Sequence, residues 1–245
     1  MADLRTFTFD SDGVATAHYS PFLDDPKFNR LWEHVSTAWF GEFWDLRWRI
    51  WILTRCGVQC RALAGSYVEF GVYRGGCSYM VLATAGLERD RPYFLFDTYS
   101  GVPDEHLTES ELEHGLAGEL ANTSADYVRE FLGNWRSNLV VVEGNIFETL
   151  AQTETGPIAF CHLDLNASWA TQLALDYLYP RLVDGGILVL DDYGWRGYED
   201  QRAVLDAFFA EKREEIIALP TGQALVIKLP PRVRTENNRR ATYTV

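Results

Sequence analysis

The sequence predicts an α/β fold built on a doubly wound, mostly parallel β-sheet. Through the middle of the chain, short apolar runs alternate with stretches of helical periodicity, and this alternation is typical of consecutive βαβ units. One run of four aliphatic residues, 187–190, follows a Gly-Gly turn and ends abruptly in Asp191 and Asp192. A short, entirely apolar run between turn signals indicates a strand that is buried on both faces, as in a parallel sheet.

Residues 1–62 are expected to form an N-terminal arm and a helical lid. Residues 1–30 are polar and rich in turn-forming residues, which predicts an arm outside the core. Apolar residues at helical spacing predict one helix over residues 28–40 and a longer one over residues 43–63. The length of 245 residues suits one large domain with such an appended segment.

A single α/β domain is predicted over residues 63–230, followed by a polar tail over residues 231–245. Strands are expected at residues 66–72, 93–96, 139–142, 158–163 and 187–190, and helices at residues 75–88, 123–131, 167–182 and 197–214. The apolar residues of the last helix that are expected to face inward are Ala203, Val204, Ala207 and Phe208.

Two further segments complete the domain. Residues 216–219 and 224–227 flank a Pro-Thr-Gly turn and predict a closing antiparallel pair, which brings the sheet to seven strands. Residues 100–122 are acidic and show no clear periodicity. A segment of this length without secondary structure of its own is a candidate active-site loop.

The charge and composition narrow the classes of partner. A net charge of −13 argues against a nucleic-acid backbone and against an anionic membrane surface. No apolar run approaches the roughly 20 residues that a membrane span needs, and the N-terminus lacks the basic and apolar halves of a signal peptide. The four cysteines are scattered along the chain, which fits a reducing compartment. We therefore expect a cytoplasmic protein with neither nucleic acid nor membrane as partner.

A glycine-rich turn follows the first predicted strand of the domain and opens a helix. Its glycines are Gly71, Gly75 and Gly76. Such a turn lets a nucleotide-like cofactor approach the backbone and the free N–H groups of the helix. The spacing does not match the dinucleotide-binding fingerprint, and a tight strand–helix turn needs glycine for steric reasons in any case. Glu69, just before the turn, would suit a cationic cofactor or an amino group.

Polar residues also follow the next two predicted strands. Asp97 ends the second strand, where an acid commonly binds the ribose hydroxyls of an adenosine. A turn acid or helix N-cap is the alternative interpretation. Asn145, after the third strand, is expected near an adenine edge because of its position.

Three carboxylates follow the fourth and fifth strands. Asp164 ends the fourth, and Asp191 and Asp192 end the fifth, so adjacent strand ends should bring them together. Ligands that are all oxygen favour a hard cation such as Mg²⁺ or Ca²⁺, and clustered carboxylates need some positive group among them. His162 lies on the strand that ends at Asp164. It is interpreted either as a satisfied core histidine or as a functional base.

With these motifs in order, the chain resembles the metal-dependent O-methyltransferases typified by macrocin O-methyltransferase (TylF). The matching pieces are residues 68–76, 96–103, 162–164 and 185–194. The resemblance implies a class I, Rossmann-like S-adenosylmethionine (SAM) fold. It also implies Mg²⁺-assisted methyl transfer to a hydroxyl of a sugar or of a glycosylated natural product, polysaccharide or glycolipid. A small-molecule or saccharide acceptor and a homo-oligomeric state are expected with it.

The resemblance also assigns roles by position. The cofactor-binding set is Glu69, Gly71, Tyr73, Ser78, Asp97, Ser100 and Asn145. Asp97 is assigned to the ribose and Gly71 to the methionine moiety. The metal ligands are Asp164, Asp191 and Asp192; the catalytic residues are Asp164, favoured as general base, and His162.

Two positions depart from the family pattern His-x-Asp-x-Asp-x-Tyr. Asn166 replaces its second acid and Ser168 replaces its tyrosine, so the acceptor pocket should differ from that of the macrolide enzymes. Three alternatives remain: a catechol-type O-methyltransferase with a flat aromatic acceptor, a nicotinamide-dependent oxidoreductase, and a non-catalytic SAM-binding or scaffold protein.

Overall fold

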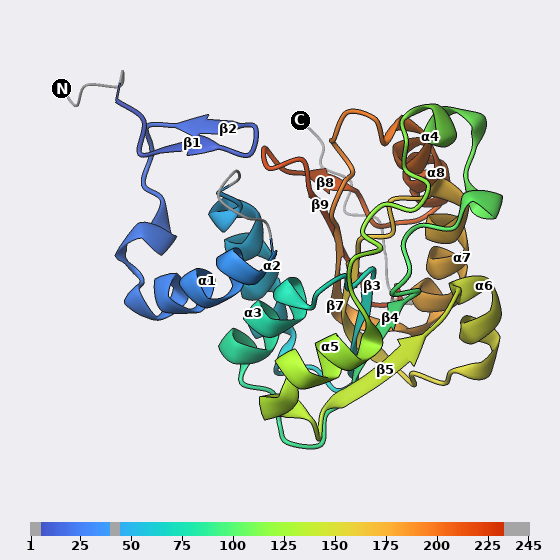
Figure 1. Cartoon of the computed structure of the whole chain (residues 1–245), viewed down its shortest axis with the longest axis horizontal. Coiled ribbons are helices and arrows are strands. Elements are labelled where there is room, and N and C mark those ends of the chain that lie inside the picture. The colour runs from blue at the N-terminus through green and yellow to red at the C-terminus, as the bar shows by residue number, and fades with distance from the viewer. Residues whose placement is uncertain (1–5, 40–44, 233–245) are drawn as a thin grey trace, which may run out of the picture.

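The computed structural model describes residues 6–39 and 45–232, and its centre is a seven-stranded sheet (Figure 1). In their spatial order the strands are β5 (Leu139–Glu143), β4 (Tyr93–Asp97), β3 (Ser66–Phe70), β6 (Ile158–Leu163), β7 (Leu182–Leu190), β9 (Ala224–Ile227) and β8 (Ile217–Ala218). Strands β3 to β7 are parallel, whereas β9 pairs antiparallel with both β7 and β8. The mostly parallel sheet and the closing antiparallel pair are confirmed.

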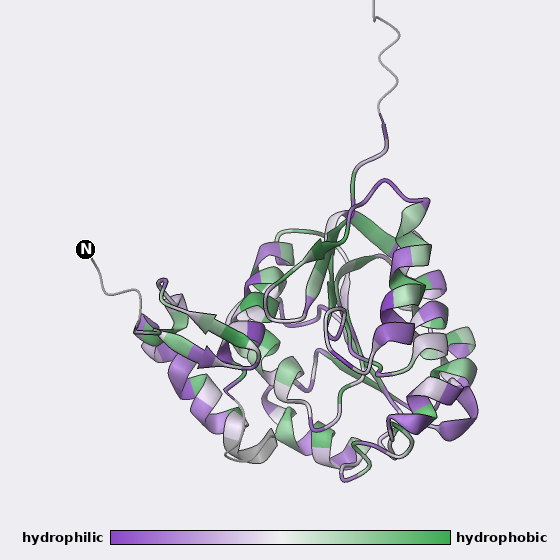
Figure 2. Ribbon diagram, turned by 90° about the horizontal axis from the view of Figure 1, so that it is seen from above, coloured by the Kyte–Doolittle hydropathy of each residue, from purple (hydrophilic) through white to green (hydrophobic). Residues whose placement is uncertain are grey.

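Helices cover both faces of this sheet (Figure 1). The helices of the described residues are α1 (Pro26–Trp39), α2 (Arg47–Cys60), α3 (Gly76–Ala85), α4 (Glu109–Glu113), α5 (Ala125–Phe131), α6 (Ile146–Thr149), α7 (Ser168–Leu178) and α8 (Glu199–Ala210). Tyr67 belongs to a hydrophobic cluster with α2, α3 and α5, and its neighbour Val68 belongs to one with α7 and α8. Because successive side chains of a strand point to opposite faces, both faces of β3 are buried. Figure 2 shows hydrophobic residues concentrated on the central strands.

The N-terminal arm is anchored in the core, contrary to the expectation for residues 1–30. Strands β1 (Phe9–Ser11) and β2 (Val14–Thr16) form an antiparallel hairpin. Phe22 is fully buried, and its ring meets that of Trp48 on α2 at a centroid distance of 5.1 Å. Aromatic side chains spaced along a polar segment supply enough apolar surface to fix it. Residues 1–5 lie outside the described part of the chain.

Helix α2 is the element that connects the arm to the sheet. Its Ile50 and Leu53 are fully buried, and the helix contacts α3, β6 and β7. The arm and α1 pack on its outer side (Figure 1). The helix predicted over 28–40 is confirmed as α1, and the one predicted over 43–63 is shorter at both ends.

Helix α8 faces the core with only two of the four residues expected, Val204 and Phe208, which are partly buried and pack against the core. Gln201, Leu205 and Phe209 are buried, whereas Ala203 and Ala207 are exposed. The prediction was wrong for Ala203 and Ala207, because the adjacent phenylalanines at 208 and 209 fit two rotations of the same helical pattern.

The acidic segment 100–122 is partly folded. It contains a 3₁₀ turn at Asp104–His106 and helix α4, whose capping box joins Thr108 and Glu111. The second carboxylate oxygen of Glu111 accepts from the N–H of Ser168 at 2.7 Å. This bond fixes the segment to the start of α7, beside the loop that follows β6.

Two expectations concern the chain ends and membranes. Residues 233–245 of the expected polar tail lie outside the described residues. Within the described ranges, no helix combines the length and apolarity that crossing a bilayer requires.

Candidate active site

The candidate site lies at the carboxyl ends of the parallel strands, where open α/β sheets bind ligands. Two adjoining cavities occupy this edge. The smaller lies among the loops after β4, β5 and β6; the larger reaches α2 and the loop after β7. Residues shared by both are Gly71, Asp97, Leu120, Asp164 and Asn166.

Gly71 lies where two loops touch. It has a φ of +82°, and a Cβ at this position would stand 1.6 Å from the carbonyl oxygen of Asp164. The glycine is therefore required by the contact between the loops after β3 and β6. That contact places the turn and Asp164 beside each other in both cavities.

Asp97 holds the glycine-rich turn through three hydrogen bonds. One oxygen accepts from the N–H groups of Val72 and Tyr73, each at 2.7 Å, and the other accepts from the N–H of Tyr99 at 2.6 Å. A carboxylate offers about four acceptor positions, so these three bonds leave one, and Asp97 lines both cavities. These bonds are those of an acid that stabilises a turn, which was the alternative interpretation of Asp97. Its binding to the ribose hydroxyls remains a prediction.

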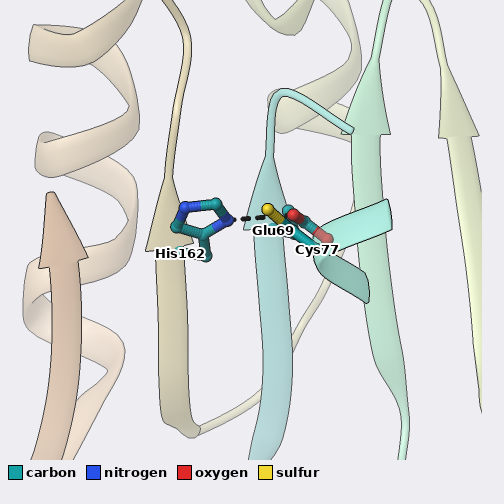
Figure 3. Close-up of side chains that lie close together, drawn as sticks. All are labelled: Glu69, Cys77 and His162. Carbon is teal, nitrogen blue, oxygen red and sulfur yellow. Dashed lines mark hydrogen bonds and ion pairs between the residues drawn. The ribbon is translucent and has the colours of Figure 1, made fainter. Parts of the chain in front are cut away.

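Glu69 and Ser78 interact with each other inside the protein. Glu69 is 1% exposed, accepts from the Ser78 hydroxyl, and lies 2.9 Å from His162 Nδ1 (Figure 3). Tyr93 donates to the same carboxylate at 3.3 Å. Glu69 thus forms part of the floor of the larger cavity, while the Ser78 hydroxyl is turned toward Glu69.

His162 bridges two carboxylates. Its Nδ1 meets Glu69, and its Nε2 lies 3.2 Å from Asp191 Oδ1. Burial lowers the pKa of His162, but the hydrogen bonds and charges of Asp191 and Glu69 outweigh it and hold that pKa well above the ordinary value. The ring is fully buried, so the core-histidine interpretation fits its position better than direct contact with a substrate. Cys77 lies beside this pair (Figure 3).

Asp191 is surrounded by donors. Its Oδ1 also accepts from Gln223 Nε2 at 2.7 Å, and its Oδ2 pairs with Arg49 Nη1. Burial acts to raise the pKa of Asp191, but the Arg49 guanidinium and His162 outweigh it and hold that pKa below its usual range. Asp191 is therefore a charged anchor whose two oxygens already have partners.

Asp164 and Asp192 are different. Neither has as many hydrogen-bonding partners as Asp191, although all three acids line the larger cavity. Burial and the neighbouring acids hold the pKa of Asp164 well above its ordinary value, and burial and Asp191 raise the pKa of Asp192 to about 6. A hard divalent cation fits this pair, because it would relieve the repulsion between the acids. Ligand atoms of His162, Asp164 and Asp191, one from each, lie within 4.8 Å of one another, so the predicted set of Asp164, Asp191 and Asp192 stays a prediction.

The three remaining residues that were predicted to bind the cofactor lie in three different places. Asn145 caps α6 through its side-chain oxygen and lines the smaller cavity. Tyr73 lines the larger cavity, with its hydroxyl 2.7 Å from the side-chain oxygen of Asn122. Ser100 is exposed beside the turn after β4.

The two positions that depart from the family pattern are both buried. Asn166 has a φ of +56°, which asparagine tolerates better than most residues. It lines both cavities, and among the described residues its side-chain oxygen has no hydrogen-bond partner. Ser168 begins α7 and is 1% exposed.

Sequence reasoning missed several residues that line or support the site. They are Arg49, Thr221 and Gln223 around Asp191, Trp195 and Tyr198 in the larger cavity, and the stacked pair of His106 and Phe147 in the smaller one. One signal was available for Arg49. It falls on the same helix face as Leu46, Ile50 and Leu53, all buried, and a cation on an inward face needs a buried partner.

A model of the macrocin O-methyltransferase (TylF) family matches residues 52–217. The chain belongs to this family. The match begins within α2 and ends at β8. It therefore includes the ends of the strands that surround the two cavities.

Individual relatives agree with the TylF assignment. A Streptomyces olivaceus protein named as an 8-demethyl-8-(2,3-dimethoxy-alpha-L-rhamnosyl)-tetracenomycin-C 4'-O-methyltransferase is 29% identical over 205 residues, covering 78% of this chain and 73% of the relative. Mycinamicin III 3''-O-methyltransferase of Micromonospora griseorubida is 28% identical over 140 residues, which cover 53% of this chain and 55% of the relative.

Solved structures share the fold of this TylF-family chain. The O-methyltransferase NovP superposes with a TM-score of 0.66 at 21% identity, over 74% of this chain and 80% of that one. The calicheamicin methyltransferase CalS11 gives a TM-score of 0.63 at 19% identity, over 93% and 97%. A Bacillus cereus O-methyltransferase in complex with SAH gives 0.56 at 14% identity, over 84% and 92%.

Proposed function

We propose that this protein transfers the methyl group of SAM to a hydroxyl of a sugar or glycosylated acceptor. The observation that carries the proposal is the shared boundary of the two cavities. Asp164 and Asn166 lie at that boundary, so a cofactor in one cavity and an acceptor in the other would meet beside them. Relatives named for O-methylation of a rhamnosyl-bearing tetracenomycin and of mycinamicin III support this class of acceptor.

The smaller cavity suits the adenosine part of the cofactor. The rings of His106 and Phe147 stack at a centroid distance of 3.7 Å and line it together with Asn145, which offers an apolar and a polar edge to a purine. Asp97 has one acceptor position left for a ribose hydroxyl. The turn at Gly71 leads from this cavity toward the larger one, and the buried charge of Glu69 below it favours a cationic group.

The chemistry requires alignment and a base. SAM would supply a methyl group on a positively charged sulfur, and a divalent ion held among Asp164, Asp191 and Asp192 would lower the pKa of the acceptor hydroxyl. With SAM bound, the acceptor oxygen would bond to the methyl carbon as the carbon–sulfur bond broke, and Asp164 would take the hydroxyl proton. The uncharged Asn166 cannot take that proton, but its unpartnered oxygen can accept a hydrogen bond from the acceptor and orient it.

A catechol-type acceptor is the second candidate. Trp195 and Tyr198 line the larger cavity, and aromatic walls can stack on a flat ring as well as on the apolar face of a sugar. The acceptor panel described next separates these two functions.

A methyl-transfer assay tests the proposal. With SAM and Mg²⁺, we expect mass spectrometry to show the gain of one methyl group on a rhamnosyl or related glycoside and none on catechols, and EDTA to abolish the gain. Asp164→Asn should reduce turnover at least about 100-fold, because it removes the base. Its affinity for SAM, measured by calorimetry, should stay within about threefold of the unmodified protein, because the cofactor contacts are kept.

Other outcomes decide against parts of the proposal. Methylation of catechols but not glycosides would replace the acceptor class. Binding of NADH without binding of SAM would overturn the reaction itself. Full turnover in EDTA would remove the metal from the mechanism.

A further inference from the structure

A second group of side chains that could hold a metal ion lies at the floor of the larger cavity. It consists of Glu69 on β3, Cys77 at the start of α3 and His162 on β6 (Figure 3). A carboxylate oxygen, the thiol sulfur and a ring nitrogen of these residues lie within 4.8 Å of one another. All three residues are at most 5% exposed, and Glu69 and Cys77 line the cavity.

The donor atoms of this group differ from those of the acids at the strand ends. Zn²⁺ binds nitrogen, oxygen and sulfur ligands in proteins, whereas Mg²⁺ and Ca²⁺ bind oxygen. A thiolate and an imidazole together therefore select zinc over the hard cations. Three protein ligands also leave the fourth tetrahedral position of a zinc ion for a water molecule. Because two of the three side chains line the larger cavity, that position would face it.

Outer contacts that would orient the ligands surround this group. The second oxygen of Glu69 accepts from the Ser78 hydroxyl and, at 3.3 Å, from Tyr93. His162 Nδ1 faces Glu69, while its Nε2 lies 3.2 Å from Asp191 Oδ1. A histidine that binds a metal through one nitrogen commonly donates the other N–H to a carboxylate, which fixes the ring. The group thus has the surroundings of a metal site as well as the ligands.

A divalent ion would replace two protons in this group. One proton lies between His162 Nδ1 and Glu69, whose atoms are 2.9 Å apart, and the other is on the Cys77 thiol. Both would pass to solvent as the nitrogen–metal and sulfur–metal bonds form. The ion brings two positive charges in exchange, so the buried group would keep its net charge and no unpaired charge would be created.

We propose that Glu69, Cys77 and His162 form a binding site for Zn²⁺ at the floor of the larger cavity. This inference goes beyond the proposed function, and it depends neither on methyl transfer nor on the site for a hard cation. His162 links the two sites, because its Nδ1 belongs to the zinc-binding group and its Nε2 faces Asp191.

Co²⁺ is the spectroscopic probe for this site, because it takes the same ligands and its bond to a thiolate gives a charge-transfer band in the near ultraviolet. The metal-free protein should bind Co²⁺ with this band. Zn²⁺ should displace the Co²⁺ and remove the band, and the titration gives the dissociation constant for Zn²⁺. An excess of Mg²⁺ should leave the band in place, because magnesium requires oxygen ligands.

Substitution of the ligands tests the assignment. Cys77→Ala should abolish the band and raise the dissociation constant for Zn²⁺ by more than about 100-fold, because losing an outer contact alone typically costs about 10–100-fold. Glu69→Gln should keep the band and raise the dissociation constant by at least about tenfold, because an uncharged oxygen replaces a carboxylate. Glu69→Gln also carries the test if Cys77→Ala fails to fold.

Cys161→Ala is the matched control. Cys161 precedes His162 on β6 and is fully buried, but it belongs to the hydrophobic cluster with α7 and α8, on the opposite face of the sheet from Cys77. Removing this thiol should leave the band in place and the dissociation constant for Zn²⁺ within about threefold of that of the unmodified protein. A loss equal to that of Cys77→Ala would overturn the inference in favour of damage to the core.

Other outcomes would also overturn the inference. Binding of Co²⁺ without a thiolate band would assign the ion to other ligands, and a band that persists in Cys77→Ala would assign it to another thiol. The zinc site would equally be rejected by an absence of Co²⁺ binding, by a band that Mg²⁺ removes, or by an unchanged Zn²⁺ affinity in Glu69→Gln. Methyl transfer to glycosides is measured separately, so its failure rejects the proposed function without deciding the zinc site.

Discussion

At the scale of single residues, the tip of the β1–β2 hairpin carries a carboxylate in an unfavourable environment. Asp12 is 5% exposed, and neither of its oxygens has a hydrogen-bond partner among the described residues. Burial raises the pKa of Asp12 from 3.8 to about 6, even though Arg49 acts to lower it. A group whose folded-state pKa lies above its unfolded value destabilises the folded state wherever it is charged in both states.

The variant Asp12→Asn should therefore stabilise the protein at pH 7.5 by about 1–2 kcal/mol. The charged Asp12 carboxylate destabilises the folded state fully above about pH 6, and this effect disappears as the pH falls toward 4. The stabilisation by Asp12→Asn should therefore shrink between pH 6 and pH 4. Urea unfolding at pH 7.5 and 4.5 measures it. Asp10→Asn, an exposed position on the same hairpin, should change little at either pH. An equal gain from Asp12→Asn at both values would contradict the assignment.

At the scale of elements, the arm behaves as part of the core. Phe22 contacts the rings of Phe9, Phe28 and Trp48. Phe22→Ala should lower the free energy of unfolding by about 3–5 kcal/mol, because a buried ring leaves a cavity. Leu23→Ala, at the adjacent residue with 41% exposure, should lower it by less than about 0.5 kcal/mol. Urea denaturation measures both free energies of unfolding. If Phe22→Ala lowered the free energy of unfolding no more than Leu23→Ala does, the arm would be only loosely attached.

The turn between β8 and β9 supports a wall of the larger cavity. Gly222 has a φ of +81°, and a Cβ there would meet the Trp195 ring at 2.5 Å. Gly222→Ala should displace this ring and lower kcat/KM for the acceptor by at least about tenfold, because acceptor alignment suffers. The affinity for SAM should be unchanged.

A glycine without a close neighbour provides the control for that change. Gly156 has a φ of +64° with open space around it, so Gly156→Ala introduces a similar backbone strain but no contact with the cavity. It should leave kcat/KM unchanged. If both variants lost activity equally, strain alone would explain the loss.

At the scale of the whole molecule, the sheet was the most predictable part. Strand β6 matches its predicted range, 158–163, residue for residue, because strands buried on both faces are continuous apolar runs bounded by polar turns. The topology then places Asp97, Asp164 and Asp191 at one edge. Their location could therefore be predicted from strand ends alone.

The contacts of those acids could not be predicted in the same way. Asp191 takes its partners from positions 49, 162 and 223, and no local pattern connects residues so far apart. Asp97 lies at its predicted position, but its oxygens bind backbone N–H groups of the turn. Which atoms a side chain contacts depends on tertiary packing, which periodicity does not encode.

The position of β9 between β7 and β8 has a consequence for the order of folding. Gln223 and Thr221 reach the acid cluster only when β9 has paired with β7, and both residues lie near the end of the chain. During synthesis, Asp191 is therefore made 32 residues before its partner Gln223. The active site should be among the last regions to reach its native arrangement, after the parallel strands have assembled, and a chain that stops before residue 224 should retain its sheet core without a completed site.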